Sequence, residues 1–112
     1  MLVVARFTVA ESDGTAFAES ARVALAALAS QPGYRGGRIG RAADDPTAWV
    51  VTTEWDGAGA YRRALSAYAV KISATPLLSR GHDGPSAFEL LYADGPGAPA
   101  TGPSARAAEA GR

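Results

Sequence analysis

The feature that most constrains the fold of this chain is an alternation of side chains with a period of two residues. It is clearest between residues 48 and 55, where every second position carries a bulky or β-branched residue: Trp49, Val51, Thr53 and Trp55. The positions between them carry Val50, Thr52 and Glu54. Because successive side chains of a β-strand point to opposite faces, this pattern predicts a strand. Residues 2–10 and 86–93 alternate in the same way, and residues 34–42 form a weaker candidate that three glycines interrupt.

Two segments with helical periodicity separate these strands. Apolar side chains recur at helical spacing from residue 17 to residue 28, and a Pro-Gly pair ends this segment near Ser30. A second helix is expected from about Gly57 to Tyr68, with Asp56 as its N-cap. The apolar stripe of this helix consists of Tyr61, Leu65 and Tyr68. Residues 69–79 suit a further turn or two before Pro76 breaks the helix.

The order of the elements is therefore β-α-β-β-α-β within residues 1–93. That order is typical of an α+β, ferredoxin-like domain, which is an antiparallel four-stranded sheet with two helices on one face. A chain of 112 residues has room for one such domain. Residues 94–112 carry no large apolar side chain, so we expect them to form a flexible C-terminal tail.

The second face of the predicted sheet has no covering element within the chain. Apolar residues nevertheless occupy that face, such as Val50 behind Trp49 and Leu91 behind Leu90. An exposed apolar face of this extent is unfavourable in a monomer. We therefore expect two copies to pair their sheets face to face in a two-fold homodimer.

Composition excludes several classes of function. The chain has no cysteine and a single histidine, His82, so a disulfide framework and a cysteine nucleophile are excluded, and a metal site or a Ser-His-Asp triad is not expected. Eleven basic residues balance eleven acidic ones, which leaves no net charge to attract nucleic acid or an anionic membrane. No secretory signal pattern opens the chain, and no apolar run reaches the roughly 20 residues that span a bilayer. We expect a cytoplasmic protein.

Two stretches of the sequence resemble the antibiotic biosynthesis monooxygenase (ABM) domain family. The run VVTTEWDGAGAYRRAL resembles its strand-to-helix signature, a strand that ends in Glu-Trp, a short cap, and then Ala-Tyr or Ala-Phe. The earlier run QPGYRGGRIGRAADDPTAWVV resembles the stretch in which Pro-Gly-Phe or Pro-Gly-Tyr leads into the second strand. The resemblance covers about residues 1–93. It implies a dimeric α/β barrel with a ligand pocket between the sheet and the helices of each subunit.

The family that the chain resembles contains more than one activity. Some relatives oxidise polycyclic aromatic phenols to quinones with dioxygen and no cofactor, others degrade haem, and many have no established activity. The haem-degrading branch is rejected, because its iron-ligating histidine would fall near Ser73 and its helical tryptophan near Ala64. Its first-strand asparagine would fall near Phe7 or Thr8, which also does not match. The polyketide-oxidising branch carries an asparagine four residues before its tryptophan, where this chain has Val51.

The resemblance implies a cofactor-independent monooxygenase or oxidase that acts on an aromatic or quinol-like small molecule. The side chains expected to contact that substrate are Phe7, Trp49, Val51, Trp55, Tyr61 and Tyr68. Three residues are candidates to assist deprotonation of the substrate, namely Tyr61, Thr53 and His82, and no metal or cofactor is expected. The alternative is a non-catalytic dimeric protein that binds a hydrophobic metabolite or serves a pathway as an accessory. Val51 favours this alternative, since a valine cannot form the hydrogen bonds of an asparagine.

Each candidate residue also has a purely structural interpretation. Aromatic residues on the apolar side of a strand or helix are commonly core residues, and Thr53 is an ordinary strand former. His82 lies in a glycine-flanked loop, where a histidine is commonly solvated. The arginines of residues 34–42 are interpreted as a solvated strand face, with anion binding as the alternative: Arg35, Arg38 and Arg41.

Overall fold

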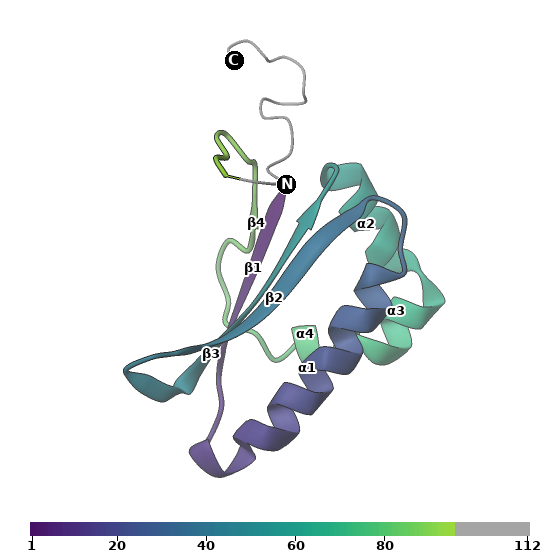
Figure 1. Ribbon diagram of the computed structural model, residues 1–112. Coiled ribbons are helices and arrows are strands. Elements are labelled where there is room, and N and C mark those ends of the chain that lie inside the picture. Colours follow the sequence, from purple (N-terminus) through teal and green to yellow (C-terminus); the bar gives the residue numbers. More distant parts are fainter. Residues whose placement is uncertain (96–112) are drawn as a thin grey trace.

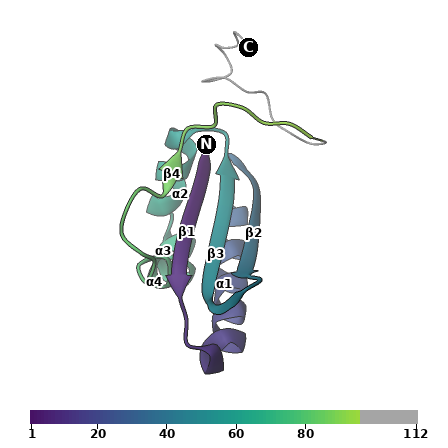
Figure 2. The same cartoon turned by 90° about the vertical axis from the view of Figure 1, so that its left-hand side faces the viewer.

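A computed structural model describes residues 1–95 of the chain, which form one antiparallel sheet with helices on one side (Figure 1). The strands are β1 (Leu2–Thr8), β2 (Tyr34–Ala42), β3 (Asp45–Trp55) and β4 (Ala87–Phe88). They lie in the order β2-β3-β1-β4 across the sheet (Figure 2). The tail predicted for residues 94–112 lies almost wholly outside the described residues.

The helices occupy the two crossovers between these strands. Between β1 and β2 the chain forms a short 3-10 turn, η1 (Glu11–Asp13), and then α1 (Gly14–Ala29). Between β3 and β4 it forms α2 (Ala58–Ser66), α3 (Tyr68–Ser73) and α4 (Thr75–Leu78). All four helices lie on the same side of the sheet (Figure 1). The predicted α+β, ferredoxin-like fold is therefore confirmed.

The single second helix that the sequence predicts is wrong in its extent, because three short helices take its place. Ala67 has an extended backbone, with φ −70° and ψ 140°, and this residue separates α2 from α3. Pro76 stands in the first turn of α4 and begins a helix instead of ending one. A proline is tolerated there because the first turn of a helix leaves its N–H groups without an internal partner.

The N-cap predicted for α2 is also wrong. Gly57, with extended backbone, holds the N-cap position, and no side chain of the described residues caps the helix. The carboxylate of Asp56 instead accepts a hydrogen bond from the Arg35 guanidinium on β2, with 2.6 Å between Nη1 and Oδ1. Arg35, which is distant in sequence, therefore binds the carboxylate that the local sequence suggests as the cap of α2.

The buried side of α2 and α3 differs from the apolar stripe that the sequence predicts for the second helix. The residues of α2 that pack against the rest of the protein are small, Ala60 and Ala64, and both are buried. Tyr61 and Leu65 are half-buried beside them, and Tyr68 on α3 is 79% exposed. Because α2 ends before Tyr68, that side chain no longer lies on the face that the helical periodicity assigned to it.

Two glycines allow the helices to approach the sheet closely. Gly33, in the turn before β2, has a φ of +88°, a conformation that favours glycine. A Cβ atom there would lie 2.5 Å from the Cβ of Ala60 on α2. A Cβ atom on Gly37 of β2 would lie 2.7 Å from Cδ1 of Leu25 on α1. Of the three glycines that weakened the strand prediction for residues 34–42, Gly37 is required by helix packing, and β2 is a full nine-residue strand.

The last strand is much shorter than the predicted segment 86–93. Only Ala87 and Phe88 pair with β1, opposite Val3 and Leu2. The pairing is antiparallel and Leu2 is the first residue of β1, so the chain beyond Phe88 passes the end of its neighbour. A strand needs a partner along its whole length, and residues 89–93 therefore have none within the described part of their own chain.

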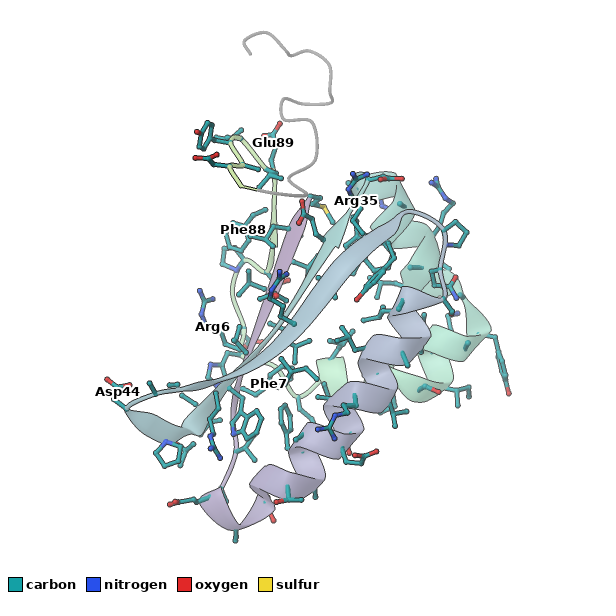
Figure 3. The ribbon with its side chains drawn as sticks, viewed as in Figure 1. Arg6, Phe7, Arg35, Asp44, Phe88 and Glu89 are labelled. Atoms are coloured by element: carbon teal, nitrogen blue, oxygen red, sulfur yellow. The ribbon has the colours of Figure 1, made fainter. Side chains whose placement is uncertain are left out.

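The alternation on β1 and β3 creates two faces of different character. We call the side against the helices the covered face; its buried residues are Val3, Phe7, Trp49, Val51, Thr53 and Trp55. We call the other side the open face; its apolar residues are Leu2, Val4, Val50 and Phe88. Figure 3 shows Phe7 between the sheet and α1, and Arg6 on the opposite side of the sheet. No helix of residues 1–95 lies over the open face, which looks toward the viewer in Figure 2.

Within residues 1–95, no helix combines the length and the apolar character that crossing a bilayer requires.

Candidate functional site

Three aromatic rings from three elements meet at one end of the covered face. Trp55, the last residue of β3, lies between Tyr34 on β2 and Tyr61 on α2. The ring centroids of Tyr34 and Trp55 are 5.3 Å apart in an edge-to-face arrangement, and those of Trp55 and Tyr61 are 5.5 Å apart and tilted. We call these residues the Trp55 group. Rings at such distances stabilise one another, and Tyr34 and Tyr61, which are half-buried, are the members of the group that a ligand can reach.

A hydrogen bond within β3 fixes the indole at the centre of this group. The indole Nε1 of Trp55 donates to the hydroxyl oxygen of Thr53 at 2.8 Å. Trp55 is 1% exposed and Thr53 is 4% exposed. The two residues are two apart on the same strand and therefore point to the same face. The hydroxyl of Thr53 is consequently engaged in orienting Trp55.

The two tyrosines of the Trp55 group are weaker acids than free tyrosine. Burial disfavours the phenolate, and it raises the pKa of Tyr61 and of Tyr34 above the ordinary value of 10.0. Both phenols therefore keep their proton at neutral pH. A protonated phenol in an apolar site can donate a hydrogen bond to an oxyanion, and it is a poor proton acceptor.

A second aromatic group lies at the other end of the covered face. The centroids of Phe7 and Phe17 are 5.1 Å apart, and those of Phe17 and Trp49 are 5.2 Å apart. The indole Nε1 of Trp49 is buried and has no hydrogen-bond partner among the described residues. Val51 stands between the two aromatic groups on β3 and is 3% exposed. The covered face is thus a largely apolar layer in which the indole N–H of Trp49 has no partner among the described residues.

His82 lies far from the Trp55 group. Its backbone N–H donates to the carbonyl of Arg6 at 2.8 Å, and its Nε2 lies 2.8 Å from the hydroxyl oxygen of Thr8. Thr8 is opposite Ala48 at the other end of β3 from Trp55. Seven residues of strand separate these two ends, which corresponds to about 23 Å. One small substrate cannot contact both His82 and Trp55.

The open face contains a hollow of about 320 Å³ beside His82. Its floor is made of small or short side chains, including Gly40, Ala48 and Val50, and Arg6 and His82 flank it. Arg41 also reaches this region, where its guanidinium lies 5.5 Å from the ring centroid of Trp49. No acidic side chain of residues 1–95 lines the hollow, so the electrostatics of its described lining suit an uncharged or anionic occupant.

No group of three or more His, Cys, Asp or Glu side chains in residues 1–95 is arranged to hold a metal ion.

The structure brings together most of the residues that the sequence singled out. The covered face holds Phe7, Trp49, Val51, Thr53 and Trp55, and Tyr61 adjoins it. Tyr68 lies on the surface, and His82 lies at the far end of the sheet. The sequence analysis missed Tyr34, which stands opposite Trp55 in the pairing of β2 with β3. The sequence shows that Tyr34 begins the weaker strand. It does not show the register that aligns the rings of Tyr34 and Trp55.

A family model described as antibiotic biosynthesis monooxygenase matches residues 1–71. A search of curated proteins finds no significant match. Among solved structures, the chain is similar to SnoaB from Streptomyces nogalater, described as a cofactor-independent oxygenase. A variant of SnoaB is 30% identical, with 72% of this chain and 82% of that chain covered and a TM-score of 0.55. SnoaB itself is 26% identical, with 71% and 80% covered and a TM-score of 0.59.

A more distant neighbour shares the fold. A conserved protein from Methanosarcina mazei Go1 is 19% identical, with 77% of this chain and 84% of that chain covered and a TM-score of 0.62. At this identity the likeness concerns the fold alone.

Proposed function

Because the chain belongs to the antibiotic biosynthesis monooxygenase family, we propose that it is a cofactor-independent oxygenase of an aromatic or quinol-like small molecule. The observation that carries the proposal is the Trp55 group, in which the half-buried Tyr34 and Tyr61 present two protonated phenols against the buried indole of Trp55. The 30% identity to the SnoaB variant supports the choice of reaction. The proposed domain is residues 1–93, followed by a tail of residues 94–112.

The proposed reaction needs no cofactor if the substrate supplies the electrons. In a phenol whose ring system contains an activated methylene, loss of a proton gives an anion that reduces dioxygen directly. One oxygen atom replaces the two methylene hydrogens as a carbonyl, and the other leaves as water. Four electrons leave the carbon and four reduce the dioxygen molecule, so the reaction balances without an external reductant.

The side chains of the Trp55 group have distinct roles in this proposal. Trp55, held by Thr53, supports the ring of Tyr61 from the core, and Tyr61 donates a hydrogen bond to the substrate oxyanion. The substrate reaches the group beside Tyr61, which is half-buried, since Trp55 itself is almost inaccessible. Val51 continues the apolar floor away from the group, and Phe7 and Trp49 lie at the far end of that floor, where they would contact only a long substrate. Tyr68 lies outside this floor and is proposed to contact only a ligand that extends to the surface of α3.

The protonation state and the position of each candidate residue decide which role it can have in the proposed reaction. Tyr61 is proposed as a hydrogen-bond donor, because its raised pKa keeps the phenol neutral. Thr53 is proposed as a positioning residue, because its hydroxyl already accepts from Trp55. His82 is too far from the group to take a proton from the same substrate. The substrate anion is therefore proposed to form through solvent, with Tyr61 stabilising it.

We further propose that the protein works in the cytoplasm as a homodimer whose open faces meet. Leu2, Val4, Val50 and Phe88 give each open face its apolar character, and a second copy supplies the matching surface. The ligand is proposed to be a hydrophobic or aromatic small molecule. Nucleic acid and membranes are not proposed as partners, because positive and negative residues balance.

The direct test is oxygen consumption by the purified protein with a panel of anthrone- and naphthol-like phenols. We expect uptake with at least one of them and quinone formation in equal amount. Tyr61→Phe is expected to slow turnover roughly 10–100-fold, since one hydrogen bond to a charged oxygen contributes about 1.5–3 kcal/mol. Tyr68→Phe is the matched control, because it removes an exposed hydroxyl of the same kind, and it is expected to keep full activity.

A second candidate function is a non-catalytic dimeric binding protein. The observation that favours it is Val51, a buried apolar side chain where the polyketide-oxidising branch was expected to carry an asparagine. Binding of the same phenols with micromolar affinity and no oxygen uptake with any of them would support this candidate and overturn the oxygenase.

A further inference from the structure

The hollow on the open face beside His82 is a site that the proposed oxygenase reaction does not use. Its volume of about 320 Å³ is that of a small ligand pocket. It lies at the end of β3 where Ala48 is opposite Thr8, and about 23 Å of strand separates that end from Trp55. The two sites can therefore take different ligands.

The hollow exists because short side chains form its floor. Gly40 of β2 is opposite Val50 of β3, and Ala48 precedes Val50 by two residues on the same face of the strand. A Cβ atom on Gly40 would lie 3.2 Å from Cγ1 of Val50, so a larger residue at this position would begin to fill the hollow. The floor is largely apolar, which suits the hydrocarbon body of a ligand.

His82 is held at the rim of the hollow by two contacts with β1. Its backbone N–H donates to the carbonyl oxygen of Arg6 at 2.8 Å, and its ring Nε2 lies 2.8 Å from the hydroxyl oxygen of Thr8. The residue is exposed, and its other ring nitrogen, Nδ1, forms no hydrogen bond with residues 1–95. An imidazole N–H at this nitrogen can therefore donate to a ligand.

The guanidinium of Arg6 supplies a positive charge at the same rim. Arg6 is exposed on the open face, opposite Val50 (Figure 3), and forms no ion pair with residues of the described range. The other arginine that lines the hollow, Arg41, has its guanidinium 5.5 Å from the ring centroid of Trp49. A free guanidinium matches a carboxylate, which it binds through two parallel hydrogen bonds.

The homodimer of the proposed function would increase the need for an anion at this position. A second copy over the open face would enclose the hollow and remove Arg6 from water. The acidic residue that the open face carries, Glu54, is opposite Leu2 at the other end of the sheet. A buried charge without a partner is strongly unfavourable, and a bound carboxylate would offset that cost.

We propose that the hollow binds a small organic carboxylate with an apolar body. The carboxylate accepts hydrogen bonds from the Arg6 guanidinium and from Nδ1 of His82. The hydrocarbon part of the ligand lies on the floor of the hollow, which is formed by Gly40, Ala48 and Val50. This site is separate from the Trp55 group and does not depend on the oxygenase reaction.

The single histidine of the chain is a direct probe of this site. Protein without a histidine tag is titrated with benzoate at constant pH and ionic strength, and the imidazole NMR signals of His82 are followed. Benzyl alcohol carries a similar ring without the charge, and inorganic phosphate carries charge without the ring. We expect a saturable shift with benzoate and at least tenfold weaker binding of the other two probes.

Three variants locate the ligand within the hollow. Arg6→Gln is expected to weaken benzoate binding about tenfold or more, because a hydrogen bond between charged groups contributes about that factor. Arg38→Gln is the matched control, since Arg38 is exposed on the same face, opposite Thr52, and does not line the hollow. It is expected to keep the benzoate affinity of the natural sequence. Ala48→Leu fills the floor and is expected to abolish the saturable shift with unchanged circular dichroism.

The outcomes separate this site from the other proposals. The absence of a saturable shift with benzoate, or equal benzoate affinity in Arg6→Gln and Arg38→Gln, overturns the site. Benzyl alcohol or phosphate that binds as tightly as benzoate overturns the assignment to a carboxylate with an apolar body. The mass in solution is measured on the same samples. A mass of one chain together with benzoate binding overturns the homodimer and leaves this site standing.

Discussion

The covered and open faces of the sheet are built from the same strands, and they differ in what meets them. On β3, Val51 is 3% exposed beneath the helices, whereas its neighbour Val50 lies on the open face and is half-buried. On β1 the same contrast separates Phe7 from Arg6 (Figure 3). One face is completed by α1 to α4 of its own chain, and no helix of residues 1–95 lies over the other, which is the face proposed for a second copy. Apolar alternation on both faces is typical of a sheet that is covered on two sides, and the chain itself covers one of them.

The largest difference between the faces is expected at the end of β3. Trp55→Ala is predicted to lower the free energy of unfolding by about 3–5 kcal/mol, because it removes a fully buried indole and leaves a cavity among Tyr34 and Tyr61. Glu54→Ala, one residue earlier on the open face, is predicted to change it by less than about 0.5 kcal/mol. Denaturant unfolding at one protein concentration measures both. Equal losses would show that the two faces do not differ as described.

A smaller contrast is expected between two adjacent valines. Val51→Ala is predicted to lower the free energy of unfolding by about 2 kcal/mol, since it removes two buried methyl groups. Val50→Ala is predicted to act mainly on association, with a higher dimer dissociation constant and little effect on the stability of the single chain. Unfolding curves over a range of protein concentrations distinguish the two effects. A concentration-independent loss in Val50→Ala would place that residue in the core of its own chain.

The pH dependence of stability sharpens the description of the covered face further. The pKa of Tyr61 is raised above 10.0 in the folded protein by burial, so the unfolded chain loses this proton first as the pH rises. At such pH the folded state binds more protons than the unfolded state. The free energy of unfolding therefore falls as the pH rises above about 10. Tyr61→Phe is predicted to reduce this fall, and Tyr68→Phe is predicted to leave it unchanged. An identical alkaline profile in all three proteins would contradict the burial of Tyr61.

The smallest effect is expected from the ion pair that replaced the predicted helix cap. Arg35→Ala removes the 2.6 Å contact with Asp56, and both side chains are about half exposed. Exposed pairs of this kind contribute about 0–1 kcal/mol, so thermal unfolding is predicted to shift little, and less in high salt. A loss comparable to that of Val51→Ala would mean that this pair anchors β2 to α2.

The sequence could predict which side chains share a face and could not predict what lies opposite them. The alternation from Trp49 to Trp55 placed four residues together on the covered face, and the structure agrees. The alternation of residues 86–93 predicts a strand that continues to residue 93. That prediction is wrong, because the length of β4 depends on where β1 begins. The contact of Tyr34 with Trp55 depends on the register of β2 and β3, which no local pattern specifies.

The second crossover shows the same limit for helices. A helical period predicted one long element from Gly57 to Tyr68, but the extended backbone at Ala67 ends α2 first. Asp56 had the chemistry of an N-cap, and Arg35 from a strand distant in sequence took its carboxylate. Local propensity is a weak preference that a tertiary partner overrides.

The central claim is that a second copy covers the open face. The mass of the purified protein in solution, measured by light scattering at micromolar concentration, tests it most directly. The account predicts twice the chain mass of 11.4 kDa for the natural sequence, and a single chain mass with unchanged circular dichroism for Val50→Lys. A natural protein that stays at the mass of one chain at these concentrations would contradict it.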